Sequence, residues 1–268
     1  MNGKTKISVI TIAYNSEKTI EQTIRSVIAQ NYDNLEYIII DGASNDSTLE
    51  IIKKYTTVYP FIKFRSEADN GISDAFNKGI ALATGKLIGL INSDDQLAYG
   101  ALDAIDRTYR ETGADVIYGN AIVDDIENGL RLYKKAGKPE QLKYEMPFIH
   151  QSCFICKHVY DSIGRYSEEY NICMDYDMLA RIYKQNYKFF NCNVTISIFQ
   201  YGGTSCKHPI KTINQDMEIA AKYGLSRKEV FTYKLKHIPI NLAKLLLSRL
   251  KVWGWIYRKF KKDSVKEN

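Results

Sequence analysis

Residues 87–95 read LIGLINSDD, and this stretch decides how the chain is expected to fold. The apolar run Leu87–Ile91 predicts a buried strand, which stops abruptly at Asn92-Ser93-Asp94-Asp95. Two adjacent carboxylates repel each other unless a positive group joins them. A divalent cation with oxygen ligands is one such group, and a solvated turn is the alternative reading of the same residues.

Segments on both sides of this stretch alternate between strand and helix patterns. Strands are expected at 6–12, 35–41, 62–66 and 116–119, and helices at 16–28, 47–55, 72–83 and 100–111. This alternation predicts an α/β fold with a mostly parallel sheet flanked by helices. Ligands bind such sheets beyond the carboxyl ends of the strands, so Asp41 and residues 92–95 are expected along one edge.

The second half of the sequence is less regular. It predicts a polar hairpin over 121–134, an apolar stretch over 148–156, a helix over 175–183 and a strand over 187–199. We expect one α/β domain over residues 1–225 and a basic helical tail over 226–268.

Composition and charge narrow the class of protein. The 268 residues are 45% hydrophobic and 25% charged, as in ordinary globular proteins. Five cysteines form no disulfide framework, and the sequence contains neither a secretory signal pattern nor an apolar run of about 20 residues. These features favour the cytoplasm or the inner face of the plasma membrane. Cys153-x-x-Cys156 has no second metal-binding pair at the required spacing, so buried thiols are expected there.

The basic charge is concentrated at the end of the chain. From residue 230 onward there are ten Lys or Arg and two Asp or Glu, whereas the rest holds 27 and 29. Within residues 240–262, apolar side chains recur at spacings of three and four: Leu242, Leu246, Leu250, Trp253, Tyr257 and Phe260. Basic and polar side chains fall on another side of the same helix: Lys244, Ser248, Lys251, Arg258 and Lys262. The pattern predicts an amphipathic helix at an anionic membrane surface, or a helix packed on the domain's own core. No nucleic-acid-binding module accompanies it.

Five short motifs, in order, resemble those of one enzyme family. They read SVITIAYN (8–15), IIIDGASNDST (38–48), DNGISDAFNKGIALATG (69–85), INSDD (91–95) and DYDMLAR (175–181). The sequence is similar to inverting family 2 glycosyltransferases of GT-A fold, and most similar to those that build bacterial O-antigen and capsule repeat units. The resemblance covers roughly residues 6–205.

The resemblance implies a role for several residues. Asn92-Ser93-Asp94 matches the DXD motif, with Asp94 as ligand of Mn²⁺ or Mg²⁺ and Asp95 as a supporting acid. Asp175 matches the general base. The implied donor-binding residues are Thr11, Ala13, Tyr14, Asp41, Asn92, Ser93, Asp69 and Asp74, and Asp41 would contact the uracil. His150-Gln151 resembles a pair that reaches the diphosphate or the acceptor.

Elementary geometry separates Asp175 from its neighbour Asp177. The two residues are two positions apart on one helix and therefore face different ways. Arg181 follows Asp177 at i+4, an ordinary ion-pair spacing, whereas Asp175 has no such partner and lies at the helix start. Asp175 is thus the better candidate for a base, although an aspartate that only begins a helix is the alternative.

The sequence also departs from the family pattern. Asn92 replaces the first Asp of DXD, Met174 replaces the Glu before the base, and Phe76 stands where many relatives have Arg. His208 is a candidate for the metal-binding histidine found in some GT-A enzymes.

The resemblance implies transfer of a sugar from a UDP-sugar to a hydroxyl of a polyprenyl-diphosphate-linked saccharide. Two other classes compete with it. A sugar-nucleotide pyrophosphorylase would need a Gly-rich basic loop after the first strand, where this chain has Ala13-Tyr14-Asn15-Ser16. A non-catalytic membrane-bound scaffold would tolerate the loss of Asp94 and Asp175. A dinucleotide oxidoreductase is not expected, because GxGxxG is absent after the first strand.

Overall fold

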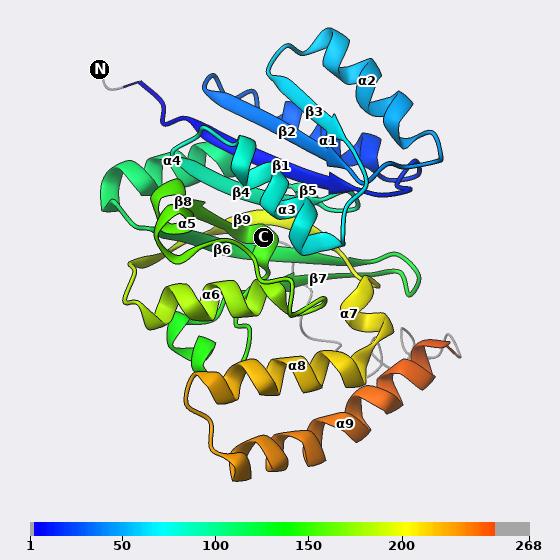
Figure 1. Ribbon diagram of the computed structural model, residues 1–268, viewed down its shortest axis with the longest axis vertical. Helices are drawn as coiled ribbons and strands as arrows, with labels where there is room; N and C mark the ends of the chain where they lie inside the picture. Colours follow the sequence, from blue (N-terminus) through cyan, green and yellow to red (C-terminus); the bar gives the residue numbers. More distant parts are fainter. Residues whose placement is uncertain (1–2, 250–268) are drawn as a thin grey trace.

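A computed structural model describes residues 3–249, in which nine strands form one sheet covered by helices (Figure 1). The first half is the predicted parallel part, with β1 (Ile7–Ala13), β2 (Leu35–Asp41), β3 (Ile62–Ser66) and β4 (Leu87–Asn92) in the order β3-β2-β1-β4. The intervening helices are α1 (Ile20–Ile28), α2 (Thr48–Val58) and α3 (Ile72–Leu82). The alternation in the sequence therefore predicted this half, although α1 begins four residues after Ser16, the expected cap.

The second half of the sheet is mixed rather than parallel. The short strand β8 (Cys153–Cys156) lies between β4 and β6 (Val116–Asp125), antiparallel to both. The long strand β9 (Phe189–Gln200) runs parallel to β6 and also pairs with β5 (Gln96–Leu97). The predicted hairpin is present as β6 and β7 (Leu130–Lys134). All four residues of β8 are buried, because this strand fills the centre of the sheet.

Helices of the second half cover the sheet and extend the molecule at one end. α4 (Ala101–Thr112) packs on β9, and α5 (Lys157–Ile163) follows β8. The turns η1 (Pro139–Lys143) and η2 (His150–Ser152) lie between β7 and β8, and α6 (Met174–Lys184) is the predicted helix at 175–183. α7 (Thr204–Lys207), α8 (Pro209–Lys222) and α9 (Arg227–Arg249) follow β9. Figure 1 shows α8 and α9 side by side at the end of the molecule opposite α2.

The two C-terminal helices share a small apolar cluster of their own. Ile213, Met217 and Ala220 of α8 are buried, and Leu225, Val230, Tyr233 and Ile238 pack against them. This cluster extends across the boundary expected at residues 225 and 226, so the start of α9 is attached to α8. Leu250, Trp253, Tyr257, Phe260, Lys251, Arg258 and Lys262, all part of the predicted amphipathic face, lie outside the described residues. Between residues 3 and 249, no helix combines the length and the apolar character needed to cross a membrane.

Cys153 and Cys156 are buried free thiols in β8, as expected. Burial raises the pKa of Cys156 to about 12, so this thiol is held in its neutral form.

A buried carboxylate joins three strands at the amino-terminal side of the sheet. Glu36 of β2 accepts hydrogen bonds from Ser8 Oγ at 2.6 Å, the Thr84 amide at 2.7 Å and Lys63 Nζ at 3.0 Å. Burial by itself would raise the pKa of Glu36, but these donors outweigh it and lower the pKa to about 2. The ionised form of Glu36 is therefore part of the folded state.

The Glu36→Gln variant is expected to lose about 2–3 kcal/mol of unfolding free energy at pH 7. The folded pKa lies below the ordinary value of 4.5, so the wild-type contribution is complete above about pH 4.5 and disappears as the pH falls toward 2. Urea unfolding at pH 7, 4.5 and 3 tests this, with Glu50→Gln on the exposed side of α2 as control. A difference between the variant and wild type that is the same at pH 7 and pH 3 would contradict the assignment.

Candidate active site

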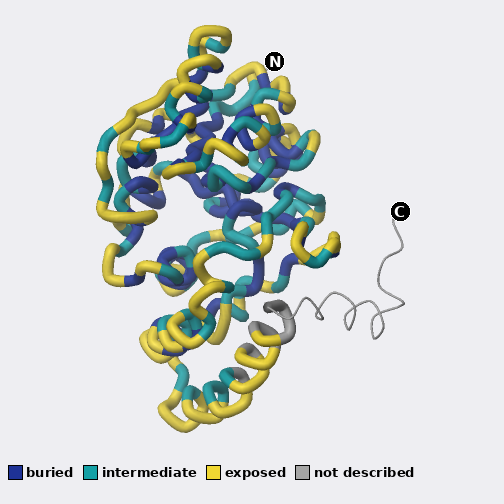
Figure 2. The backbone as a smooth tube through the Cα atoms, turned by 90° about the vertical axis from the view of Figure 1, so that its right-hand side faces the viewer, coloured by how far each residue is buried: buried dark blue, intermediate teal, exposed yellow. Residues whose placement is uncertain are grey.

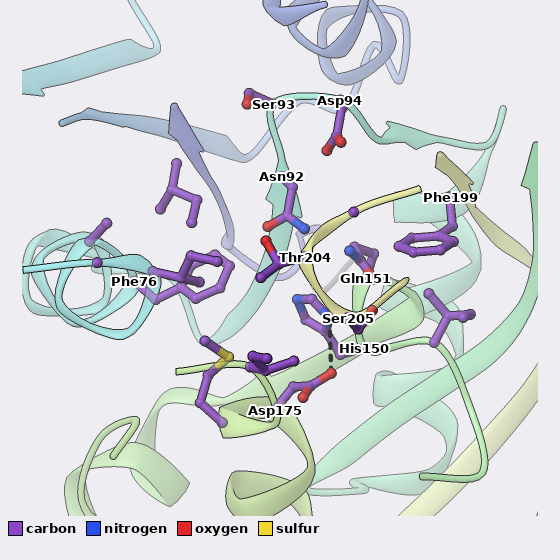
Figure 3. A pocket seen from close by; sticks show the side chains of 18 of the residues that line it. Phe76, Asn92, Ser93, Asp94, His150, Gln151, Asp175, Phe199, Thr204 and Ser205 are labelled. Carbon is purple, nitrogen blue, oxygen red and sulfur yellow. Dashed lines mark ion pairs between the residues drawn. The ribbon is translucent and has the colours of Figure 1, made fainter. Parts of the chain in front are cut away.

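A cavity of about 650 Å³ opens beyond the carboxyl ends of β1 and β4. It collects side chains from both halves of the chain, and Figure 3 shows Asp94 and Asp175 on opposite sides of it. The predicted site residues that line this cavity are Ala13, Tyr14, Asp69, Asn92, Ser93, Asp94, His150, Gln151 and Asp175. These residues, distant in sequence, meet beyond the carboxyl ends of the parallel strands, where ligands are expected to bind in a sheet of this kind.

The DXD-like turn forms one side of the cavity. Ser93 Oγ lies 2.8 Å from Ser16 Oγ, which ties the turn to the loop after β1. Burial raises the pKa of Asp94, and the nearby Lys207 partly offsets this effect. Asn92 Oδ1 is buried, and no donor among the described residues meets it.

The donor set of this turn fits a hard cation. Across residues 3–249 no three His, Cys, Asp or Glu side chains are grouped closely enough to hold a metal by themselves, and His208 does not line the cavity. Mg²⁺ and similar ions are commonly held by one or two carboxylates plus substrate phosphates and water. Asp94 fits a cation that takes its remaining ligands from a diphosphate, and Asn92, with its unpaired Oδ1, lines the same cavity.

Asp95 does not line the cavity with Asp94. Its side chain is completely buried, and its two oxygens accept hydrogen bonds from Gln151 Nε2 at 2.6 Å and from the Gln200 amide at 2.8 Å. Burial and the charge of Asp94 raise the pKa of Asp95 well above its ordinary value. Because both oxygens are occupied, this residue joins β4, η2 and β9 beneath the DXD-like turn.

Three of the predicted donor-binding residues also lie outside the cavity lining. Asp41 is completely buried and accepts hydrogen bonds from Ser44 Oγ at 2.5 Å and Ser66 Oγ at 2.6 Å. Thr11 is buried beside Tyr37, with 3.0 Å between the two hydroxyl oxygens. Asp74 accepts a hydrogen bond from the Asn70 amide at 2.9 Å, which holds the turn before α3, and pairs with Lys78 at 3.0 Å. These residues shape the cavity through the loops that they hold.

Asp175 forms the opposite side of the cavity. It lies in the first turn of α6, where Oδ1 accepts a hydrogen bond from the Tyr176 amide at 2.9 Å and Oδ2 lies 3.4 Å from His150 Nδ1. Asp177 is turned away and pairs with Arg181 at 2.9 Å, as the spacing predicted. The structure thus leaves one carboxylate of this helix facing the cavity and one in a structural ion pair.

A glutamine of α8 holds the start of α6. Gln215 Oε1 accepts hydrogen bonds from the amides of Ile172 and Cys173, at 3.1 and 3.2 Å. These amides lead directly into the turn that carries Asp175. Since helix starts leave several amides without partners, Gln215 acts as a cap supplied from another helix.

The Gln215→Ala variant is expected to lower turnover roughly tenfold, because the turn that carries Asp175 loses its anchor. The unfolding free energy should fall by only about 1–2 kcal/mol, the cost of a lost cap. Turnover and thermal unfolding measured on the same preparation test this. Asn214→Ala, an exposed position on the same helix, is the control and should change neither quantity. Turnover equal to wild type in Gln215→Ala would show that α8 does not position Asp175.

Several lining residues were not identified from the sequence. Gly203, Thr204, Ser205 and Cys206 follow β9 and reach the cavity from the C-terminal side, and Ser16 and Lys134 also line it. The small residues Gly202-Gly203-Thr204-Ser205 after a strand were a usable signal, because they allow close approach of the backbone and offer hydroxyl groups. Phe76, which stands where many relatives have Arg, also lines the cavity, and its ring packs on His150 and Tyr166.

The relatives described below are all named as glycosyltransferases. The chain is 35% identical over 121 residues to the uncharacterized glycosyltransferase YibD of Escherichia coli K12. The aligned stretch covers 45% of this chain and 35% of YibD. It is 32% identical over 114 residues to the cholesterol galactosyltransferase of Borreliella burgdorferi, 42% of this chain and 32% of that protein. The chain therefore spans about a third of the length of these two curated relatives. A PGL/p-HBAD biosynthesis glycosyltransferase of Mycobacterium bovis is 26% identical over 181 residues, 66% of this chain and 69% of that protein.

Solved structures share the fold. Staphylococcus aureus TarS 1–349, solved with UDP-GlcNAc, has a TM-score of 0.62 at 15% identity and covers 96% of this chain and 74% of its own. The mannosyltransferase PcManGT of Pyrobaculum calidifontis, solved with GDP-Man and Mn²⁺, has a TM-score of 0.67 at 14% identity, with coverage of 97% and 82%. These are GT-A glycosyltransferases, and the sheet order and the position of the cavity agree with that fold. Residues 8–190, more than half of the chain, match the family described as Glycosyl transferase family 2, and the chain belongs to that family.

Proposed function

We propose that this protein is an inverting glycosyltransferase that moves a sugar from a UDP-sugar to a hydroxyl of a lipid-linked saccharide in surface polysaccharide synthesis. The observation that carries this proposal is the presence of Asp94 and Asp175 on two sides of one cavity. One carboxylate suits a cation that binds a diphosphate, and the other suits a base. A nucleotide sugar between them would have its anomeric carbon next to the base.

The reaction proposed is a single displacement. Asp175 takes the proton of the acceptor hydroxyl while the hydroxyl oxygen forms a bond to the anomeric carbon. The bond from that carbon to the diphosphate breaks, and the nucleoside diphosphate leaves with the electron pair. An α-linked donor would give a β-glycoside. A divalent cation held by Asp94 would offset the charge that grows on the leaving group.

Tyr14 and Asp69 mark the proposed nucleoside side of the cavity. Both line it, and the loop after β2 approaches them closely: a Cβ added to Gly42 would lie 2.5 Å from Asp69 Oδ2 and 3.4 Å from Tyr14. Asp41 would act here through the loop that it holds, or it would contact the uracil of the donor after a shift of Ser44.

The proposed acceptor is held at a membrane, and α9 offers a surface suited to one. Phe231, Leu235, Leu242 and Leu246 are exposed by 67, 67, 37 and 60%. At 100° per residue they fall within about 60° of the helix circumference. Figure 2 shows most of α9 as exposed, and lysines 228, 234 and 236 accompany the apolar residues. An apolar stripe with basic neighbours suits an anionic membrane surface.

Vesicle flotation tests the membrane surface separately from catalysis. The protein should float with vesicles that contain phosphatidylglycerol, and less with phosphatidylcholine alone. The double variant Phe231→Ser/Leu235→Ser should lose binding, whereas Ile210→Ser, which removes an exposed apolar side chain from α8, should keep it. Equal flotation of both variants would remove α9 from the proposal.

The function itself is tested by nucleotide release from a panel of UDP- and GDP-sugars, with Mn²⁺, with Mg²⁺ or with EDTA. Polyprenyl-diphosphate-linked saccharides in detergent serve as acceptors. Metal-dependent release of UDP from one donor, increased by acceptor, would establish the transferase and name the sugar. Absence of both release and nucleotide binding would leave the non-catalytic scaffold as the better reading. Formation of a nucleotide sugar from a nucleoside triphosphate and a sugar phosphate would identify a pyrophosphorylase instead.

A further inference from the structure

His150 is held in one orientation from three sides. Its ring meets Phe76 edge to face, with the centroids 5.9 Å apart. Nδ1 lies 3.4 Å from Asp175 Oδ2, and the next residue, Gln151, is anchored to Asp95 at 2.6 Å. Figure 3 shows the ring between Asp175 on one side and Asn92 on the other. A histidine fixed in this way beside a proposed base calls for an explanation beyond packing.

The surroundings of the two ring nitrogens indicate where the proton lies. Nδ1 faces a carboxylate oxygen, whereas Nε2 is buried and no acceptor among the described residues meets it. A proton on Nε2 would be a buried, unpaired donor, which is costly, whereas Nδ1 has a carboxylate oxygen 3.4 Å away. We therefore assign the Nδ1–H tautomer to His150.

The two carboxylates of α6, Asp175 and Asp177, have different partners. Asp177 is paired with Arg181, a permanent cation, at 2.9 Å. Asp175, the cavity-facing carboxylate of the same helix, has an imidazole nitrogen at 3.4 Å instead, and the charge of Lys134 also acts on it. An imidazole N–H can hold the carboxylate in place without being a permanent cation.

We propose that His150 is the positioning residue of Asp175: its Nδ1–H holds the carboxylate toward the cavity, where the carboxylate can accept the proton. This inference rests on the proposed role of Asp175 and adds the residue that makes it effective. The contact of 3.4 Å is longer than an ideal hydrogen bond, and catalytic contacts of this kind commonly shorten when substrate binds.

Three substitutions separate positioning from other roles. His150→Asn places an amide N–H where Nδ1 is, His150→Gln places one where Nε2 is, and His150→Phe keeps a ring without a donor. His150→Asn should stay within about fivefold of wild-type kcat, and the other two should lose roughly 10- to 100-fold, because a misplaced base costs up to about 10²-fold. Affinity for UDP, measured by calorimetry with Mn²⁺, should be the same in all four proteins.

Equal kcat values for His150→Asn and His150→Gln would overturn the inference. So would a loss of UDP affinity in His150→Gln and His150→Phe, which would place His150 on the donor diphosphate. A wild-type protein that releases no nucleotide from any sugar donor would instead refute the proposed function.

A second measurement needs no substrate. The chain has four histidines, so their ¹⁵N NMR signals can be assigned individually. In the wild-type protein at pH 8, His150 should show the Nδ1–H form. The Nε2–H form would overturn the assignment. Besides His150 and Asp175, the titratable side chains that line the cavity are Tyr14, Asp69, Asp94, Lys134 and Cys206. The measurement at pH 8 is to be repeated in Asp94→Asn to show that the signal is independent of that carboxylate.

Discussion

Replacement of Asp175 by asparagine is expected to lower kcat about a thousandfold with little change in the affinity for UDP. Asparagine has the shape of aspartate and can still accept the hydrogen bond from the Tyr176 amide, so α6 should form as before. It cannot take a proton from the acceptor hydroxyl, and general-base catalysis contributes about 10²–10⁴ in rate. Single-turnover release of nucleotide in the presence of acceptor measures this loss.

Asp177→Asn is the matched control for Asp175→Asn, because it makes the same change on the same helix. Asp177 is buried and paired with Arg181, whose guanidinium also donates to the carbonyls of Ile163 and Arg165. Loss of this pair should lower the unfolding free energy by about 3 kcal/mol, since Arg181 is left without its charge partner. At a temperature where both variants are folded, Asp177→Asn should keep most of its turnover. The opposite ranking of the two variants in kcat would mean that Asp175 is not the base.

Replacement of Asp94 by asparagine is expected to produce the second largest effect, a loss of roughly 10²–10³ in turnover. The variant removes the carboxylate that faces the cavity at the end of β4, and with it the proposed protein ligand of the metal. Mn²⁺ titrations of turnover should shift to higher concentration or fail to saturate. Binding of Mn²⁺ measured in the presence of UDP should weaken in parallel.

Ser93→Ala is the control for Asp94→Asn. Ser93 lies in the same turn and loses only its contact with Ser16 Oγ, so metal dependence should stay as in wild type. Asp95→Asn makes the same chemical change one residue along, but at a buried site where both oxygens accept hydrogen bonds. It should reduce stability more than metal affinity, because an amide group would turn a donor toward another donor. Full metal-dependent activity in Asp94→Asn would contradict the proposed metal site.

The sequence predicted the first half of the fold and the elements that carry the two central carboxylates. Strands β1 to β4 and helix α6 have local signals, namely apolar runs, helical spacing and a polar end after a buried strand. The contrast between Asp175 and Asp177 could also be predicted, because both lie on one helix with a fixed geometry. The motifs pointed to the family because each of them is a short continuous stretch that can be read directly from the sequence.

Only the tertiary structure decided which side chains meet. It inserted β8 between β4 and β6, which brought His150 to Asp175, and it buried Asp41 and Asp95 instead of leaving them in the cavity. It also brought Thr204 and Ser205 to the site from beyond β9. Strand pairing between distant segments depends on the burial of whole faces of the sheet, and no local pattern encodes it. The sequence by itself therefore determined the elements and their carboxylates, while the tertiary structure decided that Asp94 and Asp175 line one cavity and that Asp41 and Asp95 do not.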